Sequence, residues 1–235
     1  MTVTIKGISS MATRQILAEL CDAYQKKSGR TVAIESVGGV DAARRVRAGE
    51  PFDVVVLAED AMKQLEADGL LKPGSRTGVA RSGMAVAIRA GAKRPDLASG
   101  ESLKAAVLAA KSIGYSTGPS GTHVINLLKT WGIEQTVSDR LIKAPPGIPV
   151  GVLVARGEAE LGFQQLSEFL DVPGIEIAGP LPADVQSVTL FACGVCASAT
   201  NEAGAREFIS YLTSAETDAA KRRQGMEPAR PDHAG

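Results

Sequence analysis

Hydrophobic and polar positions along this chain repeat with the period of a strand in some segments and with the period of a helix in others. Several times a strand-like segment is followed by a polar turn and then by a helix-like segment. In the clearest case, Val124, Leu127, Leu128 and Trp131 recur at i, i+3, i+4 and i+7, the spacing of one apolar helix face. Gly132 is placed to end that helix. The preceding residues, 114–122, combine hydroxyl side chains with glycines and a proline. They predict a strand end and a polar turn before the helix.

Two earlier segments repeat this order. Residues 3–8 predict a short strand, which is followed by Ser9 and Ser10. The helix expected next ends at Gly29 and carries four apolar residues on one face: Ile16, Leu17, Leu20 and Tyr24. Residues 31–34 predict another strand, and Gly38 and Gly39 separate it from a helix that starts at about residue 41. In parallel sheets, ligands bind outside the carboxyl ends of the strands, so the three turns are expected to form one site.

Each of these turns has the chemistry to hold an anion. Hydroxyl groups and the unpaired N–H groups of a helix start gather where the helix dipole is positive. An ordinary hydroxyl-capped helix would need the same residue types, but the repetition favours a site. The candidate ligand-binding residues in the turns are Ser9, Ser10, Gly38, Gly39, Ser116, Ser120, Gly121 and Thr122.

The remaining pattern predicts an α/β chain of two lobes. Strands are expected at 52–57, 84–88, 159–163 and 188–199, and helices at 61–68, 101–111, 150–156 and 203–212. Residues 70–81, rich in Gly, Pro, Ser and Arg, are interpreted as a connection. The chain then returns along 188–199, which gives lobes of residues 1–80 plus 190–235 and of residues 81–189. A cleft between lobes would enclose a small ligand.

Composition limits the partners. The chain has 235 residues, with 26 basic and 26 acidic side chains, so neither a nucleic-acid surface nor a polybasic membrane surface is expected. No apolar run reaches the roughly 18 residues of a membrane span. The chain is expected to be cytoplasmic if Met1 is the natural start, and periplasmic if a signal peptide has been removed.

Few residues suit metal, redox or nucleotide chemistry. Cys193 and Cys196 lie inside an aliphatic strand, so buried, inert thiols are expected. His123 and His233 are the histidines, too few for a zinc site. The turn at 118–122 lacks the lysine of a phosphate-binding P-loop. No metal and no cofactor are expected.

Four segments resemble the type II periplasmic binding proteins, specifically the molybdate-binding-protein-like group. They are Gly7-Ile-Ser-Ser-Met11, Pro51-Phe-Asp-Val-Val-Val-Leu57, Gly151-Val-Leu-Val-Ala-Arg-Gly-Glu-Ala-Glu-Leu-Gly-Phe163 and Gly225-Met-Glu-Pro228. The resemblance covers nearly the whole chain and implies a two-lobed α/β fold with a ligand cleft between the lobes. It also implies an oxyanion ligand held by hydroxyl and N–H groups, adds Gly151 and Val152 to the ligand-binding candidates, and implies an ABC permease as partner if the protein is exported.

One departure from that group widens the choice of ligand. Molybdate binders typically have a tyrosine after the strand that matches 161–163, whereas this chain has Gln164 and Gln165. A carboxamide can donate to a carboxylate, so a small organic acid becomes a second expectation. A subset of this fold resembles aconitate isomerase, which moves a C=C bond by proton transfer. The alternative to binding is therefore an isomerase of an unsaturated tricarboxylic acid.

An isomerase needs a group that takes up and returns a proton. Tyr115 and His123 are the candidates beside the hydroxyl-rich turn, and Glu59 is a further carboxylate option. Each also suits a structural role, as a packed, solvated or helix-capping side chain. The arginines that could clamp a carboxylate are Arg14, Arg44 and Arg81.

Overall fold

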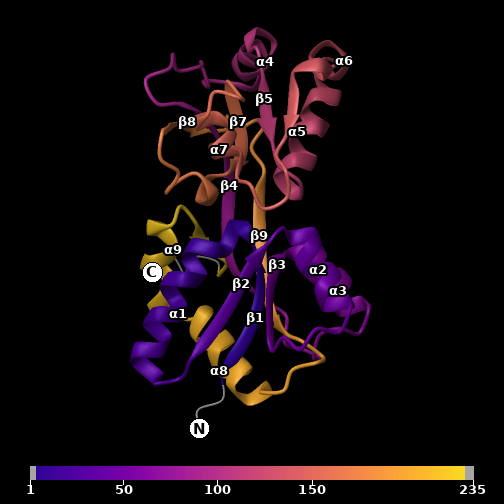
Figure 1. The fold of residues 1–235 in the computed structure, drawn as a ribbon, viewed down its shortest axis with the longest axis vertical. Helices are drawn as coiled ribbons and strands as arrows, with labels where there is room; N and C mark the ends of the chain where they lie inside the picture. Colours follow the sequence, from indigo (N-terminus) through magenta and orange to yellow (C-terminus); the bar gives the residue numbers. More distant parts are fainter. Residues whose placement is uncertain (1–3, 231–235) are drawn as a thin grey trace. The chain divides into compact units, whose positions relative to one another are not determined.

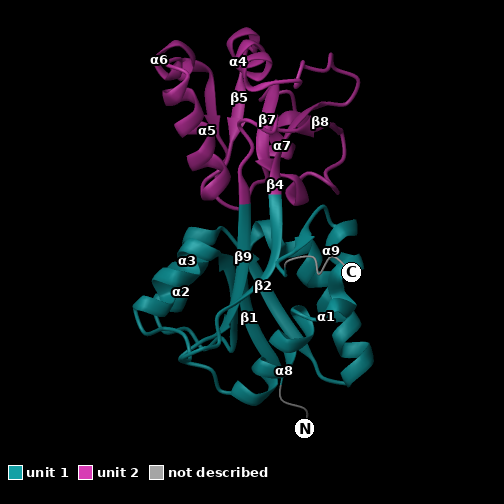
Figure 2. Ribbon diagram, turned by 180° about the vertical axis from the view of Figure 1, so that it is seen from behind, with its two compact units in different colours: residues 1–82, 189–235 teal, residues 83–188 magenta. Residues whose placement is uncertain are grey.

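The computed structural model describes residues 4–230 and divides the chain into two compact units (Figure 2). Unit 1 comprises Met1–Ser82 and Thr189–Gly235, and unit 2 comprises Gly83–Val188. The chain passes between the units twice, at the strands β4 (Thr77–Arg89) and β9 (Val188–Val195). Val3 of the first expected strand and the tail residue His233 lie outside the described residues.

Unit 1 is built on a mixed sheet (Figure 1). β1 (Ile5–Ser10) pairs in parallel with β2 (Val32–Val37) on one side and β3 (Val54–Ala58) on the other. β9 runs antiparallel to β3, and the short β10 (Glu227–Pro228) pairs antiparallel with the first part of β4. The expected strand at 52–57 is therefore present, shifted to 54–58, and the side chains of its first four residues are buried.

Helices cover both faces of this sheet. On one face lie α1 (Arg14–Ser28), α8 (Glu202–Leu212) and α9 (Asp218–Arg223), and on the other lie α2 (Gly39–Arg47) and α3 (Glu59–Ala67). The strand β3 alternates between the two cores, since Val54 and Val56 face α1 and α8 while Val55 and Leu57 face α2 and α3. Short 3-10 turns at Met11–Thr13 and Ala215–Thr217 join these elements.

Unit 2 repeats the layered plan. Its strands run in the order β4, β7 (Leu161–Gln165), β5 (Ile113–Tyr115), β6 (Leu141–Lys143), and β8 (Ile175–Pro180) also pairs with β4. β7, β5 and β6 are parallel to one another, whereas β4 is antiparallel to β7. One face packs on α4 (Gly100–Ala109), α5 (Pro119–Thr130) and α6 (Glu134–Val137), and the other on α7 (Val150–Ala155). Short 3-10 turns lie at Ser138–Arg140 and Leu166–Glu168.

The sequence interpretation of 70–81 as a connection is wrong from residue 77 onward. β4 starts at Thr77 and continues through Arg89. Its glycine and arginine have roles inside the strand. A Cβ on Gly78 would lie 2.9 Å from the Cβ of Ala229, so only glycine fits there, and Arg81 donates to the carbonyl of Pro228 across the pairing with β10. The strand β8 was not predicted from the sequence.

A buried carboxylate fixes the return of the chain into unit 1. Asp53 is 1% exposed, and its Oδ2 accepts the N–H of Lys6 at 2.9 Å. Its Oδ1 accepts the N–H groups of Thr200 and Asn201, both at 2.8 Å. One buried side chain thus accepts three backbone N–H groups that come from two distant segments of the chain.

The substitution Asp53→Asn should therefore lower the free energy of unfolding by about 2–4 kcal/mol. An amide has one oxygen where the carboxylate has two, so its NH2 group must face a backbone donor. Urea unfolding checks this, with Asp22→Asn as control, because Asp22 forms only an exposed pair with Lys26. Equal midpoints for the two variants would contradict the assigned role.

Lys221 is the second buried charge in unit 1. Its Nζ donates to the carbonyl of Leu212 at 2.7 Å, and the residue is 1% exposed. Burial lowers the pKa of Lys221 from its ordinary value of 10.5 to about 8, and the nearby Asp218 carboxylate opposes that shift. The charged form is therefore disfavoured in the folded state.

This shift predicts a pH dependence of stability. Between pH 8 and pH 10.5 the unfolded chain binds more protons at Lys221 than the folded chain does, so stability rises with pH in that window. The free energy of unfolding of the wild type minus that of Lys221→Met should accordingly increase from pH 8 to pH 10. Urea titrations at several pH values measure the difference, and a pH-independent value would contradict the prediction.

Candidate functional site

In unit 1 the predicted polar residues collect at the carboxyl edge of the parallel strands. β1 and β2 pair with Ser9 opposite Ser36, and the two hydroxyl oxygens are 2.7 Å apart. Ser10 is 8% exposed, and its hydroxyl oxygen has no hydrogen-bond partner within the described part of the chain. A buried hydroxyl without a partner is costly, so this group is available to a ligand.

Gly38 and Gly39 stand next to that hydroxyl. A Cβ on Gly39 would lie 3.7 Å from the Cβ of Ser10. Gly38 is the N-cap of α2, and no side chain caps this helix start. The first N–H groups of a helix have no partner inside the helix, and they carry its positive dipole end. Asp41 adds a carboxylate to this first turn, but that carboxylate is paired with Arg44.

In unit 2 the turn after β5 has the same chemistry. The hydroxyl oxygens of Ser116 and Ser120 are 2.9 Å apart, and Ser120 is buried. Gly118 has a φ of +83° and caps α5 without a side-chain bond. A Cβ on Gly121 would lie 1.7 Å from the carbonyl oxygen of Ser116. The turn closes this tightly only with glycine at that position.

The predicted proton-transfer residues of this turn are engaged in the fold. Nε2 of His123 lies 2.8 Å from the carbonyl of Val185 and donates to it, which leaves Nδ1 as its free basic nitrogen. Tyr115 is half-buried and packs against the core under α4 and α5. Thr122 donates its hydroxyl to the carbonyl of Gly118 at 3.0 Å and is exposed.

Gln164, near the carboxyl end of β7, connects the start of α7 to the 3-10 turn that follows β7. Its Oε1 accepts the N–H of Val150 at 2.9 Å, which orients the amide so that Nε2 donates to the carboxyl group of Glu168. Gln165 is buried at the end of the same strand. Because β5 and β7 pair in parallel, with Tyr115 opposite Phe163, the chain leaves both strands at one edge.

Gly151 and Val152 lie in the first turn of α7. A Cβ on Gly151 would come within 3.1 Å of Val172 and 3.2 Å of Ile175, so glycine serves the packing of α7 here. The N–H of Val152 donates to the carbonyl of Pro149 at 3.0 Å. This N–H is therefore already used within the chain.

Glu168 is a residue that sequence reasoning missed. It ends the 3-10 turn after β7 and is half-buried, and burial raises the pKa of its carboxyl group to about 8. A single acid inside the apolar run Leu166-Ser-Glu-Phe-Leu170 was the available signal. A carboxyl group with a shifted pKa, close to the edge of a sheet where a ligand is expected, is typical of a functional site.

Other sequence candidates have partners in the fold. Glu59 forms ion pairs with Arg76 and Lys63, and Arg81 donates to Pro228. Burial raises the pKa of the Cys193 and Cys196 thiols to about 12, in keeping with inert cysteines.

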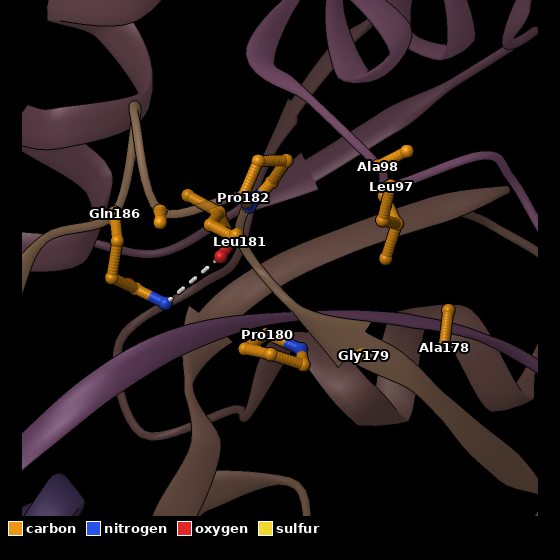
Figure 3. Close-up of a pocket in the computed structure, with 9 residues that line it drawn as sticks. Leu97, Ala98, Ala178, Gly179, Pro180, Leu181, Pro182 and Gln186 are labelled. Atoms are coloured by element: carbon orange, nitrogen blue, oxygen red, sulfur yellow. Dashed lines mark hydrogen bonds between the residues drawn. The ribbon is translucent and has the colours of Figure 1, made fainter.

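Unit 2 also has a cavity of about 550 Å³ beside β8 (Figure 3). Gln186 points to it and donates through Nε2 to the carbonyl of Leu181. The lining has no ionisable side chain and includes none of the predicted site residues: Leu97, Ala98, Ala178, Gly179, Pro180, Leu181, Pro182, Ala183 and Gln186. The cavity therefore has no cationic side chain for an anion, and the amide of Gln186 already donates within the chain.

Among residues 4–230, no group of three or more His, Cys, Asp or Glu side chains is placed to hold a metal ion. Within the same range, no helix is both long and apolar enough to span a bilayer.

Comparisons with known proteins agree with this architecture. An aconitate isomerase from Pseudomonas sp. is 34% identical over 232 residues, which are 96% of this chain and 88% of the relative. The Azotobacter vinelandii periplasmic molybdate-binding protein superposes with a TM-score of 0.81 at 22% identity, covering 97% of this chain and 99% of that one. The periplasmic binding protein AgtB from A. tumefaciens R10, solved with agropinic acid, gives a TM-score of 0.70 at 17% identity, covering 97% and 83%.

The expected fold class, the α/β fold of type II periplasmic binding proteins, is confirmed. Residues 5–227 match the model of the bacterial extracellular solute-binding proteins, and the chain belongs to that family.

Proposed function

We propose that this protein binds a small oxyanion or organic carboxylate through polar turns of the kind that follow β1 and β2 in unit 1 and β5 in unit 2. The observation that carries the proposal is the Ser10 hydroxyl, which is buried and without a partner among the described residues. A ligand oxygen beside it would satisfy this hydroxyl, and the adjoining N–H groups of α2 suit a negative charge.

The helix starts support this proposal. Away from the turns, side chains cap the helices α4 and α8, through Ser99 and Asn201. The helices α2 and α5 begin instead at Gly38 and Gly118, with no side-chain cap. Uncapped N–H groups beside hydroxyl pairs are suited to accept an oxygen ligand in place of a cap.

A second candidate function is isomerisation of an unsaturated tricarboxylic acid. Two observations favour it. The aconitate isomerase relative matches over 96% of this chain, and Glu168 provides a carboxyl group with a pKa near neutrality at the edge of β7. Gln164, one of the two carboxamides that stand in place of a tyrosine, supports this candidate function indirectly, because its NH2 group donates to Glu168.

A transport role would add a membrane permease of the ABC type as partner, since the family consists of extracellular solute-binding proteins. The ligand alone would be the partner of an isomerase. In either case the ligand is a small anion, and the residues proposed to contact it are the same.

A thermal-shift screen tests the proposal. Molybdate, tungstate, sulfate, citrate, cis-aconitate and trans-aconitate are each added at millimolar concentration. A ligand present at 100 times its dissociation constant stabilises the native state by about 2.7 kcal/mol and raises the melting temperature. We expect at least one anion of the set to do so, with the tricarboxylates ahead of molybdate. No shift with any of them would overturn anion binding.

Removal of single hydroxyls tests the site itself. Ser10→Ala and Ser120→Ala should each weaken binding of the best anion by about 1–3 kcal/mol in calorimetry. Ser10→Ala should leave the free protein at least as stable as the wild type, because the hydroxyl that it removes has no partner in the described chain. Ser210→Ala, at an exposed position of α8, is the control. Unchanged affinity in both site variants would contradict the assignment.

A further inference from the structure

We propose that Glu168 is the group that takes up and returns the ligand's proton, an inference that rests on the isomerase function proposed above. Among the residues that sequence reasoning offered, Glu59 forms an ion pair with Arg76, and His123 is bound through Nε2 to the carbonyl of Val185 and keeps Nδ1 alone as an acceptor. Glu168 accepts a hydrogen bond from the neutral amide of Gln164 and has no ion pair among the described side chains. Its carboxyl group therefore keeps lone pairs for a ligand.

The position of Glu168 follows from strand pairing. It lies three residues beyond Gln165, the last residue of β7, and β7 is parallel to β5. The segment after β7 and the hydroxyl-rich turn after β5 thus leave the sheet at the same edge. Glu168 itself is half-buried.

The orientation of the carboxyl group is also set by the backbone. The N–H of Val150 holds Oε1 of Gln164 at 2.9 Å, so the amide must present its NH2 group to Glu168. This hydrogen bond holds one carboxyl oxygen, Oε2, in a fixed direction. A general base needs such a fixed direction toward the proton that it removes.

The surroundings of Glu168 are apolar. Its neighbours Leu166 and Phe169 join a core formed with α7, β6, β8 and the unit 2 part of β4. The ionisable residues on these elements are Arg89 at the end of β4, Lys143 at the exposed end of β6, and Glu176 of β8, which pairs with Arg94. Burial, and not a neighbouring charge, is the cause of the raised pKa of Glu168.

The Glu168 carboxyl group can carry out both proton transfers of the reaction. The Glu168 carboxylate removes a proton from a methylene carbon next to a ligand carboxylate, and the C–H electron pair spreads over the adjacent double bond. The same carboxyl group then gives the proton to the far alkene carbon, a C–H bond forms there, and the double bond has moved. Glu168 returns to its carboxylate form with no oxidant, reductant or co-reactant. Hydroxyl and N–H donors of the turn at 116–121 are suited to stabilise the transient negative charge.

The decisive test follows interconversion of cis- and trans-aconitate by proton NMR, with binding of trans-aconitate measured in parallel by thermal shift. Glu168→Gln should slow interconversion by about 10²–10⁴ fold, because general acid–base catalysis usually contributes that much to the rate. The variant should retain the thermal shift with trans-aconitate. Glu158→Gln, at an exposed position of the same unit, should keep the wild-type rate.

The pH profile separates a proton-transfer role from a structural one. Proton removal needs the ionised carboxylate, so kcat/KM of the wild type should rise with pH through about 8 and then level off. The residual rate of Glu168→Gln should lack that rise, whereas Glu158→Gln should retain it.

The remaining outcomes overturn different parts of the proposal. A Glu168→Gln rate within threefold of wild type overturns the role of Glu168 and leaves the isomerase function standing. A wild-type protein that binds trans-aconitate without converting it overturns both Glu168 as base and the isomerase function, while anion binding stands. Absence of any thermal shift by the whole set of anions overturns the proposed function itself.

Discussion

Parallel strand pairing is the constraint on which the candidate site depends. β1 pairs with β2 and β5 pairs with β7, both in parallel, so in each unit two successive polar segments leave the sheet at the same edge. Residues far apart in the sequence, such as Ser9 and Ser36, become hydrogen-bonded neighbours for that reason. An antiparallel pairing of the same strands would send one of the two segments to the opposite edge.

Glycine makes these edges usable by a ligand. At Gly121 a Cβ would collide with the carbonyl of Ser116, so the turn can close around its hydroxyls only with glycine. At Gly39 there is room for a larger side chain, so close packing does not explain the glycine. The relevant feature here is that no side chain caps the start of α2. Without side-chain caps the helix N–H groups remain for another acceptor, next to a Ser10 hydroxyl that also has none among the described residues. An anion bound there, as proposed, would give these donors a partner.

Buried charge has different consequences in the two units. In unit 1 the Asp53 carboxylate accepts backbone N–H groups on both oxygens and closes the fold. In unit 2 Glu168 meets one neutral amide and an apolar surrounding, and its proton is held more tightly than usual. The same functional group thus serves as a structural acceptor in one place, whereas in the other burial raises its pKa to about 8.

The sequence by itself determined the alternation of strands and helices, the polar turns and the fold family. These features depend on local periodicity and on short motifs, which neighbouring residues set. It did not reveal β8 or the full length of β4, since Gly78 and Arg81 match a loop by composition and owe their place in a strand to Ala229 and Pro228, which are distant in the chain. Glu168 was missed for a related reason. The sequence shows that residue 168 has a carboxyl group. Only tertiary packing decides how far that group is buried from water, and burial sets its pKa.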